Sequence, residues 1–261
     1  MPDRWVVLAR QRQLNILAEV QRRGGVRVSS LTSMFGVSDM TVRRDLGVLA
    51  RQGLVQKVHG GATLPRPPSS SEPGFTAKSA LQQSKKAAIA AAAAALVPPD
   101  AAVALSAGTT VWTLARHLLD VPGLTIGTNS VPVADLFHAE GTAGATVVLS
   151  GGVRSPSDAL VGPVADATFR GLHFDVAFVG CHGLHLTCGL TTPNLAEAET
   201  NRALIRSARR LVVLADCTKW DIVGLSSFAD LAEVDVLVTD AALDARAVEA
   251  LRERVDEVIL A

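Results

Sequence analysis

The chain has 261 residues, of which 48% are hydrophobic and 19% are charged. This composition excludes a wholly disordered chain and a collagen-like chain, and the length predicts one or two domains. Lys plus Arg and Asp plus Glu both number 25, so the formal net charge is zero. Taken over the whole chain, this neutrality argues against a nucleic-acid binder, which usually carries an excess of basic residues.

Cysteine content and apolar runs indicate the compartment. Three cysteines in a chain of this length do not make a disulfide framework, which favours a reducing cytoplasm. Residues 5–9 are apolar but too few for the core of a signal peptide. The longest apolar run, residues 87–97, is shorter than the about 18 residues that a membrane span needs. We therefore expect a soluble, cytoplasmic protein without a membrane partner.

A proline-rich segment divides the chain. Residues 63–74 read TLPRPPSSSEPG, and their four prolines cannot lie inside a helix or a sheet. We therefore predict a linker at residues 63–76 between a first domain, 1–62, and a second domain, 77–261. Residues 1–64 hold ten basic and four acidic residues, a net charge of +6, which leaves −6 for the remainder. A basic small domain beside an acidic large one is typical of a nucleic-acid module joined to another domain.

Three helices are predicted in the first domain. Apolar residues at helical spacing indicate a first helix over residues 10–23, which Gly24 ends. We expect Ser29 or Ser30 to cap a second helix that continues through Phe35. A third helix follows directly and completes a recognisable motif.

The second and third helices predict a helix-turn-helix. Gly36 supplies the turn, Ser38 caps the third helix, and Gly53 ends it. In this arrangement the second helix of the pair enters the DNA major groove and its first residues meet the bases. The candidates for DNA contact are therefore Ser38, Asp39, Met40, Thr41, Arg43 and Arg44.

The basic residues of this domain have two interpretations. Arg43 and Arg44 suit contacts with guanine and phosphate, but an Arg-Arg pair is also common on a solvated helix face. Residues 54–62 predict an extended segment and a tight glycine turn, from which Lys57 and His59 would reach phosphates or a minor groove. The helix pattern, the local charge and this wing agree, so we favour DNA contact.

These residues resemble a known family. Residues 36–62, GVSDMTVRRDLGVLARQGLVQKVHGGA, are similar to the DNA-binding domain of the DeoR family of bacterial transcriptional regulators. The segments after the linker are also similar to this family, so the resemblance covers nearly the whole chain. It implies a winged helix-turn-helix that binds operator DNA.

The second domain alternates strand-like and helix-like segments. The apolar runs are nearly continuous in Val, Leu and Ala, which is expected of parallel strands buried on both faces. We predict an α/β domain with a mostly parallel sheet. The expected strands are 101–105, 124–128, 146–149, 175–180, 211–215, 235–239 and 256–260. The expected helices are 77–97, 111–119, 131–139, 195–209 and 244–252.

Polar or glycine-rich sequences follow several of these strands. Ligands of such sheets bind beyond the carboxyl ends of the strands. Residues 106–110, SAGTT, join the first strand to a helix, and their backbone amides and hydroxyls suit a phosphate. Neither phosphate-loop nor dinucleotide-binding glycine motifs are present, so ATP, GTP and dinucleotides are not favoured. Residues 128–130, 151–152 and 216–219 close other strands, and together they predict a ligand pocket.

The family resemblance implies roles for particular residues. The second domain is similar to the family's effector domain, which is related in fold to ribose-5-phosphate isomerase. The resemblance implies that Gly108, Thr109 and Thr110 bind a sugar phosphate. We expect the remaining pocket residues to be Ser106, Thr128, Asn129, Gly151, Gly152, His182, Glu197, Arg202 and Lys219.

Two positions depart from the family pattern. Ser106 stands where the family usually has Asp, and Asn201 stands where it usually has Lys. The first departure changes the charge beside the sugar and reduces repulsion toward an anionic ligand. The identity of the effector therefore cannot be carried over from the family.

An enzyme is the main alternative. The related isomerases use carboxylates after the strand that corresponds to 175–180, where this chain has residues 180–184, GCHGL, without an Asp or Glu to act as general base. His182 has no partner identifiable from the sequence, so we expect no catalysis and no cofactor. Cys181, His182, His185 and Cys188 suit zinc by type, but their spacing is not that of a usual zinc site, and we expect no metal.

We therefore expect a transcriptional repressor of carbohydrate-metabolism genes. A phosphorylated sugar or related metabolite would release it from its operator, and paired half-sites favour a dimer or tetramer. The alternatives that the sequence leaves open are a sugar-phosphate isomerase with an accessory DNA-binding domain, and a transcriptional activator or architectural DNA protein.

Overall fold

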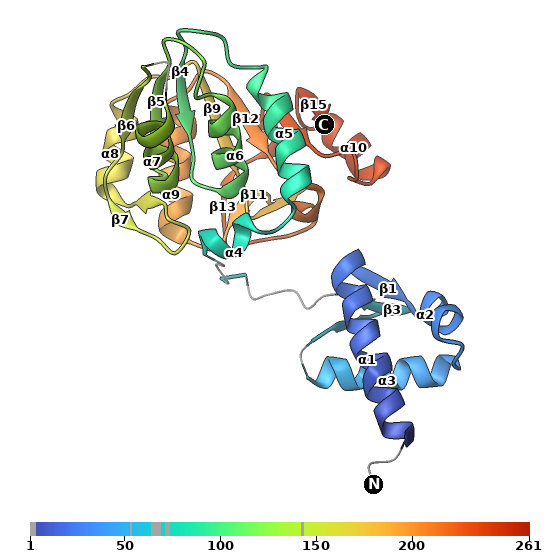
Figure 1. Ribbon diagram of the computed structural model, residues 1–261. Coiled ribbons are helices and arrows are strands. Elements are labelled where there is room, and N and C mark those ends of the chain that lie inside the picture. The colour runs from blue at the N-terminus through green and yellow to red at the C-terminus, as the bar shows by residue number, and fades with distance from the viewer. Residues whose placement is uncertain (1–3, 53, 64–68, 71–73, 142–143) are drawn as a thin grey trace. The chain divides into compact units, whose positions relative to one another are not determined.

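The computed structural model describes residues 4–52, 54–63, 69–70, 74–141 and 144–261. The chain forms two compact units, Met1–Pro68 and Ser69–Ala261, shown in Figure 1. Within the described residues, no helix is long and apolar enough to cross a membrane.

The first unit packs three helices against a small antiparallel sheet. Its strands lie in the order β1-β3-β2. Apolar side chains from all three helices form one core, which includes Ile16, Leu31 and Leu46. The elements in chain order are α1 (Arg4–Arg23), β1 (Gly25–Arg27), α2 (Val28–Phe35), α3 (Asp39–Arg51), β2 (Gln56–Val58) and β3 (Gly61–Thr63). The predicted helix-turn-helix and wing are therefore confirmed.

The boundaries of these helices differ from the predictions in two places. Helix α1 begins at Arg4 rather than at residue 10. The predicted cap of α2 by Ser29 or Ser30 is wrong, because α2 begins at Val28 directly after strand β1. The Val28 amide donates to the Gly60 carbonyl at 2.8 Å, so the wing satisfies an amide that a serine would otherwise cap. The predicted end of α3 at Gly53 lies outside the described residues.

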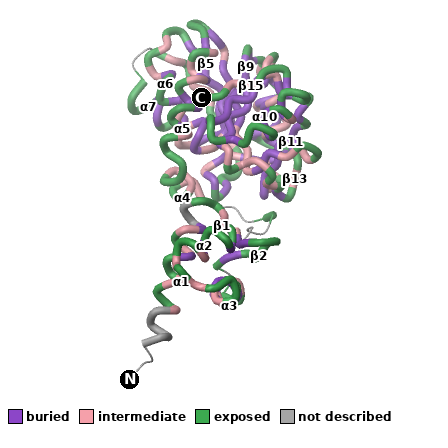
Figure 2. Tube along the Cα trace, turned by 90° about the vertical axis from the view of Figure 1, so that its right-hand side faces the viewer, coloured by how far each residue is buried: buried purple, intermediate pink, exposed green. Residues whose placement is uncertain are grey.

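The second unit is built on a sheet of seven parallel strands, as predicted. Their order is β15-β14-β12-β9-β4-β5-β6. Figure 2 shows buried residues concentrated in this sheet, while the helices around it have exposed outer faces. The strands are β4 (Ala102–Leu105), β5 (Thr125–Thr128), β6 (Thr146–Leu149), β9 (Val176–Gly180), β12 (Leu211–Leu214), β14 (Val236–Thr239) and β15 (Glu257–Leu260).

Helices cover both faces of this sheet. One apolar core contains residues of α5 (Gln83–Ala94), α6 (Thr109–His117) and α7 (Val131–Glu140). The core on the other face contains residues of α8 (Pro163–Arg170), α9 (Leu195–Arg206) and α10 (Ala245–Arg252). Two hydrophobic layers therefore enclose strands that are apolar on both faces.

The predicted single helix over residues 77–97 is wrong. Two helices, α4 (Phe75–Ser79) and α5, occupy this region, and Gln82 between them has φ of +53°. The buried Lys86 ammonium of α5 donates to the Lys78 carbonyl at 2.6 Å. That bond satisfies a carbonyl at the end of α4, which has lost its helical partner because the helix is interrupted before α5.

Several short elements of the second unit had no sequence signal. An antiparallel sheet contains β10 (Gly183–His185), β11 (Gly189–Thr192) and β13 (Ser226–Ala229), and a hairpin contains β7 (Val153–Arg154) and β8 (Leu160–Val161). Helix α8 and two short 3-10 helices, η1 (Cys217–Lys219) and η2 (Leu231–Glu233), were also not predicted. The strands and 3-10 helices among these elements have two to four residues each and are too short for hydrophobic periodicity to identify.

Candidate nucleic-acid interface and ligand site

Helix α3 presents a polar face opposite its buried stripe. The Ser38 hydroxyl caps it by accepting from the Thr41 amide at 3.3 Å, as predicted. Val42 and Leu46 are buried in the core, whereas Met40 is 81% exposed. The cap and the buried residues hold the first turns of α3 in place, and the side chains on the opposite face of the helix are accessible to a partner.

The two arginines of α3 differ in their surroundings. Arg43 pairs with Asp39 four residues earlier, and that hydrogen bond raises the pKa of Arg43. Arg44 is exposed and has no ion-pair partner among the described residues. Because Arg43 would have to leave a carboxylate to meet DNA, Arg44 is the better placed of the two for base contact.

The wing brings a further cation to α3. A Cβ atom built on Gly47 would lie 3.7 Å from the Lys57 Nζ and 3.8 Å from an Arg51 guanidinium nitrogen. Lys57 therefore lies over the middle of the helix, where its charge extends the basic surface. His59 is exposed in the turn between β2 and β3.

A buried carboxylate fixes the position of α3. Asp45 is 3% exposed and accepts from the Arg12 Nε at 2.6 Å and from the Gln13 Nε2 at 2.8 Å. These bonds join α3 to α1 across the helix-turn-helix. The sequence prediction counted Asp45 only as a charge, although an acid between Val42 and Leu46 on an apolar stripe was a usable signal.

We predict that Asp45→Ala destabilises the first unit by about 2–3 kcal/mol, because it leaves Arg12 and Gln13 without their acceptor. Amide hydrogen exchange of α3 in the full chain measures this as a lower free energy of opening. The matched control is Asp39→Ala, which removes an exposed pair and should cost about 1 kcal/mol or less. Equal effects of the two substitutions would refute the anchoring role of Asp45.

The second candidate site lies at the carboxyl edge of the large sheet. Leu105 pairs with Thr128, and Thr128 pairs with Leu149, so the loops after β4, β5 and β6 begin side by side. Leu214 pairs with Gly180 and with Val238, which brings together the loops after β9, β12 and β14. The register therefore places at one edge the strand-end segments that the sequence singled out.

The loop between β4 and α6 has the geometry of an anion site. Gly108 has φ of +140°, a conformation that residues with a Cβ rarely adopt, and it precedes the first residue of α6. The amides of Gly108, Thr109 and Thr110 have no acceptor among the described residues. Free amides at the start of a helix attract a phosphate or carboxylate.

Neighbouring strand ends hold this loop in place. The Asn129 Oδ1 accepts from the Ala107 amide at 2.9 Å, and its amide nitrogen donates to the Leu160 carbonyl at 3.2 Å. The Thr128 hydroxyl donates to the Leu105 carbonyl at 2.7 Å. Thr128 and Asn129, both predicted pocket residues, thus hold the loop in position.

Ser106 also acts between strands. It is 1% exposed, and its hydroxyl accepts from the Gly180 amide at 3.1 Å. The hydroxyl therefore joins the ends of β4 and β9. The two predicted glycines, Gly151 and Gly152, have positive φ, and a Cβ on Gly152 would lie 2.6 Å from the Val161 carbonyl oxygen.

Two more predicted residues follow β9 and β12. Lys219 ends the short helix η1, and its charge lowers the pKa of Cys181. Burial outweighs that effect and raises the pKa of the Cys181 thiol to about 12. The His182 backbone amide donates to the Thr191 carbonyl at 3.0 Å, which ties this loop to the small sheet.

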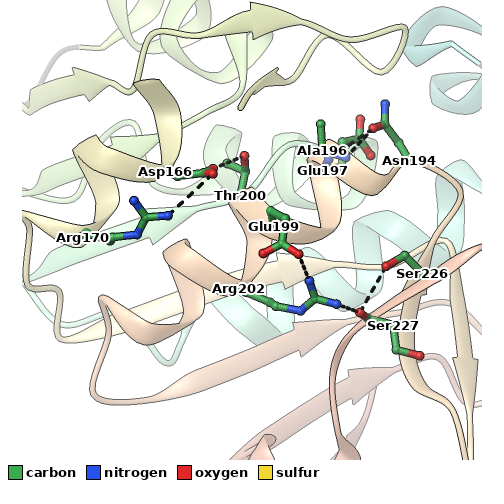
Figure 3. Close-up of polar contacts among 10 residues, drawn as sticks. All are labelled: Asp166, Arg170, Asn194, Ala196, Glu197, Glu199, Thr200, Arg202, Ser226 and Ser227. Carbon is green, nitrogen blue, oxygen red and sulfur yellow. Dashed lines mark hydrogen bonds and ion pairs between the residues drawn. The ribbon is translucent and has the colours of Figure 1, made fainter. Parts of the chain in front are cut away.

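The structure separates the two predicted residues of α9. Glu197 accepts from the hydroxyls of Ser155 at 2.7 Å and Thr192 at 3.2 Å. Arg202 instead contacts Glu199 and the carbonyl of Ser227 on β13, as Figure 3 shows. It lines a hollow of about 230 Å³ with Ser227 and other residues of β13, so it is occupied away from the strand-end loops.

The cysteine and histidine segment does not gather metal ligands. The His185 Nδ1 accepts from the amides of Thr187 at 3.2 Å and Cys188 at 3.3 Å, and its Nε2 lies 3.6 Å from Asp221. Both ring nitrogens thus face protein groups. Across the described part of the chain, no three His, Cys, Asp or Glu side chains form a group that could hold a metal.

Comparison with known proteins identifies both domains. A model of the DeoR-like helix-turn-helix domain matches residues 12–67, and a model of the DeoR C-terminal sensor domain matches residues 81–241. The chain is 34% identical over 241 residues to the HTH-type transcriptional regulator GlpR of Haloferax volcanii, covering 92% of each chain. It is 29% identical to the glycerol-3-phosphate regulon repressor of Escherichia coli, covering 88% of this chain and 90% of the relative.

A solved structure is also similar to part of the chain. Ribose 5-phosphate isomerase A of Methanocaldococcus jannaschii has 17% identity and a TM-score of 0.40, covering 53% of this chain and 54% of that chain. The two domain models together match residues of both units, and the relatives match about nine-tenths of the chain. The chain belongs to the DeoR family of DNA-binding transcriptional regulators.

Proposed function

We propose that this regulator is a repressor of carbohydrate-metabolism genes and that a phosphorylated sugar or related metabolite releases it from its operator. The observation that carries the proposal is the start of α6, where the amides of Gly108, Thr109 and Thr110 have no acceptor among the described residues and suit a phosphate. The regulatory sign follows the relatives, one of which is named as the repressor of a glycerol-3-phosphate regulon.

DNA contact would come from the exposed face of α3 and from the wing. The residues that we propose for it are Ser38, Met40, Thr41, Arg43, Arg44, Lys57 and His59. Operators with two-fold symmetry are matched by paired helix-turn-helix units, so we propose a homodimer or homotetramer.

A packed aromatic pair supports communication between the ligand loop and the linker. The Trp112 amide donates to the Gly108 carbonyl at 2.9 Å, so this residue moves with the loop. Its indole meets the Phe75 ring edge to face, with centroids 6.1 Å apart. Phe75 begins α4, the first helix after the linker. A ligand that shifts the start of α6 would therefore displace α4 and the chain that leads to the DNA-binding unit.

We propose that the second unit binds its ligand without turning it over. The carboxylates that follow β12 and β14 accept backbone hydrogen bonds: Asp216 from the Thr218 amide at 3.0 Å, and Asp240 from the Cys217 amide at 2.7 Å. A carboxylate engaged in this way is a poor general base for moving a proton between sugar carbons.

The test is operator release by the full chain. An operator is first selected from a random DNA library by the wild-type protein, and release is measured by fluorescence anisotropy. We expect at least one phosphorylated sugar to release the DNA while its unphosphorylated form does not. Release by unphosphorylated sugars alone, or turnover of pentose phosphates, would overturn the proposal.

A further inference from the structure

The first turn of α5 is electrostatically unfavourable as it stands. Lys85 and Lys86 lie in this turn, no acidic residue accompanies them, and the helix has no side-chain cap. The positive end of a helix macrodipole repels cations and attracts anions. Asp240 lies 3.7 Å from the Lys85 Nζ, whereas Lys86 has no ion-pair partner among the described residues, so the repulsion is uncompensated mainly at Lys86.

Burial makes the conflict stronger for Lys86. The residue is 5% exposed, and the Lys78 carbonyl is the one acceptor that its ammonium has among the described residues. An ammonium has three N–H donors. Burial lowers the pKa of Lys86, and the charges of Lys219 and Lys78 lower it further, against the opposite effect of Asp216. Lys86 therefore lies among two lysines and Asp216, and a bound anion would accept from the donors that the Lys78 carbonyl leaves over.

The lysine cluster, formed by Lys85, Lys86 and Lys219, lies at the same sheet edge as the ligand loop. The Lys85 Nζ is 3.0 Å from the Cys217 Sγ and 3.7 Å from the Asp240 Oδ1, so α5 begins beside the ends of β12 and β14. Strand β9 separates β12 from β4, where the loop begins. With adjacent strands about 4.8 Å apart, the ends of β12 and β4 are about 10 Å from each other. That separation is comparable to the length of a small sugar with a charged group at each end.

We propose that Lys85, Lys86 and Lys219 form a second anion subsite, and that the effector is a metabolite with two anionic groups. One phosphate would occupy the loop at Gly108, and the second group, a phosphate or a carboxylate, would occupy the lysine cluster. This inference rests on the proposed function and narrows its ligand to a class. Sugar bisphosphates and phosphorylated sugar acids belong to that class.

Matched ligand pairs test the proposal on the full chain. Fructose 1,6-bisphosphate is compared with fructose 1-phosphate and fructose 6-phosphate, and 6-phosphogluconate is compared with glucose 6-phosphate, by calorimetry and thermal shift. We expect at least one doubly anionic ligand to bind about tenfold or more tightly than its singly phosphorylated partner. The two pairs separate a second phosphate from a carboxylate.

The variant Lys86→Met distinguishes a ligand-binding role from a structural one. We expect it to reduce the advantage of the doubly anionic ligand, and to change the melting temperature without ligand, because it removes a buried cation and also the hydrogen bond to the Lys78 carbonyl. Lys219→Gln should also reduce that advantage. Arg209→Met removes the same charge at an exposed position just before β12. It should alter neither the melting temperature nor the preference for the doubly anionic ligand. A lower melting temperature of Lys86→Met with unchanged ligand preference would overturn the subsite.

Different results would refute the second anion subsite and the proposed function. If singly and doubly anionic partners bind equally, the second subsite is refuted and the sugar-phosphate sensor stands. If no phosphorylated compound binds or releases DNA, the proposed function fails and the subsite fails with it.

Discussion

Arg44→Ala is expected to weaken operator binding by about ten- to a hundredfold while leaving ligand binding by the second unit unchanged. One good bidentate contact between arginine and guanine contributes about 1–3 kcal/mol of discrimination. Arg44 is exposed on α3 and has no ion-pair partner among the described residues, so its guanidinium meets DNA without first breaking a bond. Fluorescence anisotropy with the selected operator measures the loss.

Two controls separate base contact from a general loss of charge. Arg23→Ala removes the same charge from α1, where Arg23 pairs with Glu19, and we expect little change in affinity. Arg43→Ala should have a smaller effect than Arg44→Ala, because Asp39 already holds the Arg43 guanidinium. If Arg44→Ala binds the operator as tightly as the wild type, α3 is not the recognition helix.

Local rules account for the features that the sequence predicted well. The Ser38 cap follows from side-chain chemistry within four residues, and the seven strands follow from nearly continuous apolar runs. The parallel arrangement then places all strand-end loops at one edge, which is why the ligand loop at Gly108 could be located from the sequence.

Contacts between distant residues account for what was missed. Asp45 and Arg12 are 33 positions apart, so their ion pair depends on how α1 crosses α3. Arg202 was assigned to the pocket by resemblance, but its partner is the Ser227 carbonyl, 25 positions away on a strand that periodicity did not reveal. The lysine cluster likewise forms only when α5 starts at residue 83, after a break that the alanine-rich sequence conceals.

Gly108→Ala is expected to abolish operator release by the effector while leaving DNA binding intact, so the variant would repress permanently. An alanine at φ of +140° is strained by about 1–3 kcal/mol, although its Cβ would meet no atom within 4 Å. The loop must therefore rearrange, and its amides lose the geometry that suits a phosphate. Anisotropy with and without a releasing sugar phosphate measures the response, and thermal shift measures ligand binding.

The control for this prediction is Gly144→Ala. Gly144 also has positive φ, at +68°, and a Cβ there would meet no atom within 4 Å, but it precedes β6 at the opposite edge of the sheet. Gly144→Ala should lower the stability of the second unit without affecting operator release by the effector. Thr109→Val keeps the shape of the loop and removes one hydroxyl, so it tests the site even if Gly108→Ala folds poorly. A normal response in both Gly108→Ala and Thr109→Val would place the effector elsewhere, because neither the loop geometry nor its hydroxyl would then matter.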